Sequence, residues 1–189
     1  MPTRILTAVL LLFCTQNFIS ADDALVETSE VKLKGLTLNV PKGWTQSKKR
    51  SSMRLATFEI PAGEGDQDPA EMAIYNFPGG GGPVDSNISR WVGQFDSKGR
   101  ESRITKGKAG DSDYYMVEVS GTYNQPVGPP IRRQTKAVEG SRMLAVILQL
   151  DQGVYFLKLT GQDKTIKAQR KLLRQSFGGS TEGETEYKP

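Results

Sequence analysis

Apolar and polar residues alternate along much of the chain, and this pattern predicts strands. Leu36, Leu38 and Val40 alternate with polar residues until Pro41, which indicates a strand with one buried face. The charged segment 22–34 has no clear period, so we expect a loosely packed leader before a domain that starts near residue 35. The remaining strand candidates are 55–60, 72–77, 103–108, 114–123 and 131–138. We expect the first two of these to be antiparallel neighbours.

The segment 143–150 differs from the others because it is apolar on both faces for most of its length. Such a strand is expected at the centre of a sheet with both faces covered. A short turn at 151–153 leads to the apolar segment 154–159, so the two segments predict a hairpin. Helices are therefore required on both faces of the sheet.

Two segments carry the spacing of amphipathic helices. The first follows the glycine run 79–82, with Asp85 or Ser86 as its expected N-cap. Its apolar stripe consists of Ile88, Trp91, Val92 and Phe95. The second covers about 164–177 and buries the side that carries Ile166, Leu173 and Phe177. We expect the acidic tail 179–189 to be disordered. The predicted fold class is α+β, with an antiparallel sheet flanked by helices on both faces.

The N-terminal segment 1–21 has the layout of a cleavable signal peptide. Arg4 precedes an apolar run at 5–13, and cleavage is expected after Ala21. The run is too short to span a bilayer permanently. We therefore expect a soluble protein that is secreted or periplasmic. Cys14 is the only cysteine, so the mature chain would have no disulfide. An acylated Cys14 is the alternative, and Phe13 disfavours it because a small residue is wanted there.

The composition restricts the chemistry that this chain can perform. Its formal charge of +4 falls to +3 without the signal, which removes one arginine and no acid, so nucleic acid is not an expected partner. Histidine is absent, which excludes Ser-His-Asp and Cys-His catalysis and the usual zinc sites. Carboxylate, lysine, tyrosine and serine chemistry remains open.

The order of elements resembles the PsbP-like superfamily over roughly 35–178. The resemblance rests on a strand that runs into Pro41-x-Gly43-Trp44, the apolar strand 154–159 and a terminal helix that ends at Phe177. It implies an α/β/α sandwich that is mostly non-catalytic. The chain also resembles uncharacterised exported bacterial proteins, through three motifs to which no activity is attached. These motifs are Trp91-x-x-Gln94-Phe95, Gly121-Thr-Tyr123 and Phe156-x-Lys158-Leu-Thr-Gly161.

Candidate binding residues form a basic set and an aromatic pair. The basic residues are Lys164, Lys167, Lys171, Arg132 and Arg133, which could contact an acidic partner. The alternative is that the lysines are only the solvated side of a helix. The loops around Trp44 and Tyr123 are further binding candidates. An exposed Trp44 beside a groove would indicate sugar or peptide binding, but core packing is the favoured interpretation for Trp44. The glycine run 79–82 lacks the lysine of a phosphate-binding loop, and the acidic loop 63–69 lacks the downstream glutamate of a calcium loop. We predict no catalytic residue, metal or cofactor.

The favoured hypothesis is a non-catalytic binding or accessory protein whose partner is an unknown macromolecule of the cell envelope. The alternative is a histidine-free hydrolase that uses carboxylates. Acidic side chains converging in one pocket would favour the hydrolase. The sequence leaves the oligomeric state open.

Overall fold

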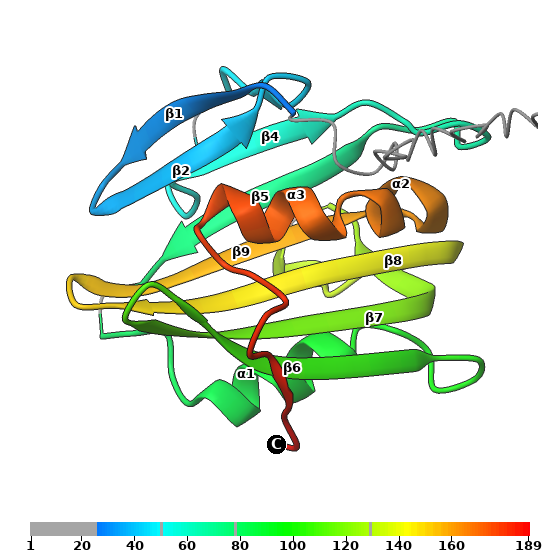
Figure 1. The fold of residues 1–189 in the computed structure, drawn as a ribbon. Helices are drawn as coiled ribbons and strands as arrows, with labels where there is room; N and C mark the ends of the chain where they lie inside the picture. The colour runs from blue at the N-terminus through cyan, green and yellow to red at the C-terminus, as the bar shows by residue number, and fades with distance from the viewer. Residues whose placement is uncertain (1–25, 50, 78, 129) are drawn as a thin grey trace, which may run out of the picture.

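The structure, a computed structural model, describes residues 26–49, 51–77, 79–128 and 130–189 (Figure 1). An eight-stranded antiparallel sheet dominates it, in the order β10-β6-β7-β8-β9-β5-β4-β3. The strands are β3 Thr45–Gln46, β4 Ala56–Ile60, β5 Ala70–Asn76, β6 Glu101–Ala109, β7 Ser112–Pro126, β8 Thr135–Leu150, β9 Gly153–Gln162 and β10 Thr185–Glu186. The predicted antiparallel sheet of an α+β fold is confirmed.

The apolar segment 143–150 lies at the centre of the sheet, as predicted. It forms the second half of β8, which pairs with β7 on one side and with β9 on the other. Residues 143–148 are all buried. The β8–β9 hairpin is also confirmed, with Leu150 opposite Gly153. The polar candidate 131–138 is not a separate strand: a 3₁₀ turn at Pro130–Arg132 precedes β8, and β8 runs without interruption from Thr135.

The two faces of the sheet have different covers. Helices α2 Asp163–Ala168 and α3 Arg170–Ser176 pack on one face, where Ile166 and Leu173 are fully buried. The hairpin of β1 Thr28–Leu33 and β2 Leu36–Pro41 supplies part of the same cover through its buried leucines. Helix α1 Val84–Val92 packs against the other cluster, which includes Val117 and Phe156. The helices are short, and strands make up most of the fold.

The predicted leader and tail are more ordered than expected. Residues 28–33 form β1 and pair with β2 through a turn at Gly35, whose φ of 70° suits glycine. Val31 and Leu33 of β1 are partly buried and pack against the core. The tail 179–189 was expected to be disordered, but it carries β10, which pairs with β6. An ion pair between Glu184 and Arg174 holds the tail against α3.

The helix predictions need two corrections. The segment 164–177 forms two helices, because Gln169 interrupts it between α2 and α3. In α1, the N-cap is Pro83 rather than Asp85 or Ser86, and no side chain caps the helix. Of the predicted apolar stripe, Ile88 and Trp91 are buried on α1, Val92 is partly buried at its end, and Phe95 is buried in the segment after the helix.

Among the described residues, no helix is both long enough and apolar enough to span a membrane. The predicted signal peptide at 1–21 and Cys14 lie outside the described residues.

Candidate functional site

The basic residues predicted from the sequence are exposed. Lys164 and Lys167 lie on α2 and Lys171 lies on α3, all on the side away from the buried Ile166 and Leu173. The other two predicted basic residues, Arg132 and Arg133, are exposed in the connection between β7 and β8.

The two aromatic candidates are buried. Trp44 is 6% exposed, and its indole Nε1 donates a hydrogen bond to the Gln169 side chain at 3.1 Å. This hydrogen bond links the turn between β2 and β3 to the break between α2 and α3. Tyr123 is 8% exposed, and its hydroxyl accepts a hydrogen bond from Lys158 Nζ at 3.1 Å. Core packing therefore accounts for Trp44, and neither ring forms an open platform for a ligand.

A polar pocket of about 670 Å³ lies between α3 and the strands β6, β7 and β8. Its lining includes five cationic and three acidic side chains, together with five hydroxyl-bearing residues. The cations are Arg103, Arg142, Arg170, Lys171 and Arg174. The acids are Glu101, Glu118 and Glu184. Of the predicted basic residues, only Lys171 belongs to this lining.

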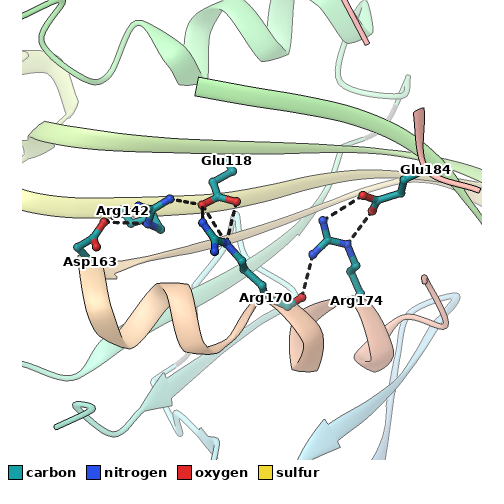
Figure 2. A network of polar contacts seen from close by, with 6 residues as sticks. All are labelled: Glu118, Arg142, Asp163, Arg170, Arg174 and Glu184. Atoms are coloured by element: carbon teal, nitrogen blue, oxygen red, sulfur yellow. Dashed lines mark hydrogen bonds and ion pairs between the residues drawn. The ribbon is translucent and has the colours of Figure 1, made fainter. Parts of the chain in front are cut away.

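Glu118 is the centre of the ion-pair network in the pocket (Figure 2). It lies on β7 and shares a face with Met116, because alternate residues of a strand point the same way. Its carboxylate accepts hydrogen bonds from Arg142 and from Arg170, whose Nε lies 3.0 and 2.9 Å from the two carboxylate oxygens. Arg142 also donates from Nε to Asp163 at 2.8 Å, which links β8 to the start of α2.

Arg174 and Glu184 form a second, bidentate pair at the other end of the network (Figure 2). Arg174 Nε and Nη2 donate to the two carboxylate oxygens at 2.6 and 3.1 Å. The Tyr114 hydroxyl donates to the same carboxylate at 2.6 Å. Burial alone would raise the pKa of Glu184, but the hydrogen bonds from Arg174 and Tyr114 outweigh it and hold that pKa below its usual value. Glu184 is therefore ionised at neutral pH.

The acidic loop 63–69 has a structural role. Asp66 accepts hydrogen bonds from the backbone N–H and the hydroxyl of Thr165, both at 2.7 Å, near the start of α2. These bonds lower the pKa of Asp66. Within the part of the chain that the structure describes, no group of three or more acidic, cysteine or histidine side chains could hold a metal ion.

Sequence reasoning missed the arginines and glutamates of the network. Glu118 is the single charge within the apolar run 114–119, and Arg142 directly precedes the buried segment 143–148. A lone charge at the edge of or inside a buried strand is a usable signal, because such a charge is rare unless it is paired. The positions of the partners, however, depend on how α3 docks on the sheet.

No protein-family model matches the chain, and no curated protein matches it. Solved structures with a similar fold include the solution structure of cyanobacterial PsbP from Synechocystis sp. PCC 6803, at 13% identity and a TM-score of 0.47. That similarity covers 89% of this chain and 98% of the other. The crystal structure of PA94 from Pseudomonas aeruginosa, a protein of unknown function, has 12% identity and a TM-score of 0.43, with 79% and 92% covered. At these identities and TM-scores, neither similarity assigns a family, a function or a partner to this chain.

Proposed function

We propose that this chain is a non-catalytic binding protein that takes an acidic segment of a macromolecular partner into the pocket beneath α3. The observation that carries the proposal is the charge of the lining, with five cations and three acids. An acidic chain that enters the pocket meets this excess of positive charge together with hydroxyl groups that can donate hydrogen bonds. Lys171 and Arg103, both exposed, stand at the entrance.

The same network disfavours a carboxylate-dependent hydrolase. Three acids do converge in the pocket, and such a hydrolase needs one carboxyl group that stays protonated as a general acid. Glu118 accepts hydrogen bonds from two arginines, and Glu184 has a lowered pKa. Both carboxylates therefore act as hydrogen-bond acceptors and not as proton donors. The third acid, Glu101, is exposed at the start of β6. The arrangement therefore supports binding rather than hydrolysis.

We further propose that the protein is exported and acts outside the cytoplasm, as an accessory to a partner in the cell envelope. The support is the layout of residues 1–21 in the sequence. Mass spectrometry of the protein from its native host tests this proposal. A chain that begins near Asp22 is expected, and an intact chain recovered from the cytoplasm would contradict export.

Binding in the pocket is tested with a hexaglutamate peptide as the probe, measured by calorimetry at low salt and at about 150 mM salt. The entrance variant Arg103→Gln/Lys171→Gln is compared with the control Lys164→Gln/Lys167→Gln, which removes the same charge from the exposed side of α2. We expect the affinity to fall about tenfold in the entrance variant, which corresponds to about 1.4 kcal/mol, and less than twofold in the control.

The result separates three cases. A loss confined to the entrance variant supports the pocket. Equal losses in the two variants would show that hexaglutamate binds the basic helix face in general and would overturn the pocket as the site. If the wild-type protein does not bind hexaglutamate even at low salt, the proposed function is wrong.

A further inference from the structure

Lys158 is a partly buried amine on the opposite face of the sheet from the pocket. It lies on β9 between Leu157 and Leu159, which belong to the core under α2 and α3, so its side chain points to the α1 side. Its Nζ donates hydrogen bonds to Gln94 Oε1 at 2.6 Å and to the Tyr123 hydroxyl at 3.1 Å. The ammonium also lies 5.2 Å from the centre of the Tyr123 ring. We call Gln94, Tyr123 and Lys158 the amine cluster.

The fold assembles the amine cluster from three distant segments. The chain after α1 pairs with the far part of β7, where the backbone N–H of Asn124 donates to the Gln94 carbonyl at 2.8 Å. A β-bulge between Gly121 and Tyr123 re-aims the strand at this point. Beneath the cluster, the residues that flank Lys158 on the neighbouring strands are both alanines, Ala73 and Ala145, which leave room for its side chain.

The partners of this amine are neutral. No carboxylate among the described residues lies within ion-pair distance of Lys158, and the nearby Glu71 is paired with Arg54 at 2.8 Å. A partly buried ammonium without a carboxylate partner is uncommon in proteins. Burial lowers the pKa of Lys158 most, and repulsion from Arg90 and Arg54 adds to that effect. Glu71 raises this pKa, and the net result of all these causes is a pKa of about 8.

These surroundings favour the neutral, nucleophilic form of the Lys158 amine. Compared with an ordinary lysine, an amine with a pKa of about 8 has about 300 times more of its neutral form at pH 7. Burial and nearby cations are the two means by which enzymes and carriers activate a lysine for imine formation. Burial also raises the pKa of Tyr123 to about 12, so its hydroxyl keeps its proton and can donate a hydrogen bond.

We propose that Lys158 reversibly captures a small oxo-acid, a compound with a ketone or aldehyde next to a carboxylate, as an imine. The neutral amine attacks the carbonyl carbon, a C–N bond forms, and the carbonyl oxygen leaves as water. The Tyr123 hydroxyl lies at hydrogen-bond distance from the amine and donates to the oxygen as it leaves. Arg90 contributes the positive charge that favours a carboxylate on the captured compound, whereas Arg54 is already paired with Glu71. No oxidant or reductant is needed, and hydrolysis reverses the step.

The proposal is tested by trapping the imine of pyruvate with cyanoborohydride in the folded protein, followed by peptide mapping. We expect Lys158 to be labelled at least tenfold faster than the exposed Lys164 at pH 7. The rate should rise with pH and level off above about pH 8. Acetone, which lacks the carboxylate, should label Lys158 several-fold more slowly than pyruvate does.

Three variants sharpen the test. Lys158→Arg keeps the charge and should lose the label at this position, whereas Arg90→Gln should reduce the preference for pyruvate over acetone. Tyr123→Phe should slow labelling without changing its position. Equal labelling of Lys158 and Lys164, or no labelling of Lys158, overturns the proposal. Neither outcome bears on the pocket beneath α3, because hexaglutamate binding involves different residues on the other face.

Discussion

Glu118 and Lys158 each place a single charge between two apolar residues of a central strand, yet the two charges meet different surroundings. Glu118 faces α3 and is held by two arginines, Arg142 and Arg170. Lys158 faces the α1 side and is held by an amide oxygen and a phenol. Opposite charges compensate the first site, whereas the second site keeps its cation without an anion. The comparison teaches that the charges at the first site stabilise one another within the fold, whereas Lys158 has only neutral hydrogen-bond partners.

The distribution of helices explains the difference. The face that carries Glu118 is covered by α2 and α3, which bring Arg170 and Arg174 over the sheet. The face that carries Lys158 is covered by α1 and by the chain after it, which brings Gln94. The identity of the covering segment therefore decides whether a buried charge meets its counter-ion.

The largest expected effect on stability comes from shortening Trp91, a side chain that packs between α1 and the sheet. Trp91 is buried and packs edge-on against Phe156, with ring centres 6.0 Å apart. Trp91→Ala should lower the free energy of unfolding by about 3 to 5 kcal/mol, the usual cost of emptying a large buried aromatic site. Urea unfolding provides the measurement.

Leu173→Ala on the opposite face is the matched control for this prediction. Both variants should be destabilised, but only Trp91→Ala should change the labelling of Lys158, because α1 and Gln94 belong to that side. Labelling of Lys158 that changes equally in the two variants would contradict the separation of the two faces. An unchanged unfolding midpoint for Trp91→Ala would show that the stripe of α1 is not a core element.

The next largest effect is the contribution of Lys158 to the pH dependence of the free energy of unfolding. Its folded pKa of about 8 lies below the ordinary value of 10.5, so between these values the unfolded chain binds more protons. Stability therefore rises with pH in this window, and the cost of burying the charge is fully present below about pH 8. Relative to Lys158→Met, the wild-type protein should gain about 2.5 kcal/mol between about pH 7 and pH 10. Chemical unfolding at the two pH values measures this difference, and parallel curves for the two proteins would show that Lys158 has an ordinary pKa.

A smaller loss of stability is expected when Glu118, the central acid of the ion-pair network, is neutralised. Glu118→Gln leaves Arg142 and Arg170 without their shared carboxylate. Breaking a fully buried pair costs about 3 to 5 kcal/mol, and the partial exposure of Arg170 reduces the expected loss to about 2 kcal/mol. The control Glu30→Gln removes an exposed pair with Lys32 and should change the free energy of unfolding by less than about 0.5 kcal/mol. Equal losses in denaturant unfolding of the two variants would show that the network is no more than a surface pair.

Several strands could be predicted from the sequence because their signals are local. The alternation at 36–40 and the double-sided apolar run at 143–150 predict their own burial, and the structure agrees. The β1 strand and the tail were missed for a physical reason. Their residues gain order from pairing with other segments and from the Arg174–Glu184 ion pair, which no local pattern records.

The candidate sites show the same division. The exposure of Lys164, Lys167 and Lys171 followed from helical periodicity, because burying the apolar side of a helix turns the other side to solvent. The pocket did not follow, since its lining combines β6, β7 and β8 with α3 and the tail.

The sequence by itself determined which residues are charged, which strands are buried and which helix faces are apolar, because these properties depend on residue type and on spacing along the chain. The tertiary structure decided which charges meet. Glu118 and Arg170 are 52 positions apart, and Lys158 and Gln94 are 64 positions apart. Contacts at such separations depend on strand order, on the bulge after Gly121 and on the break at Gln169. These features arise from the packing of the whole sheet, so the pairing of Glu118 and the isolation of Lys158 become visible only in the folded protein.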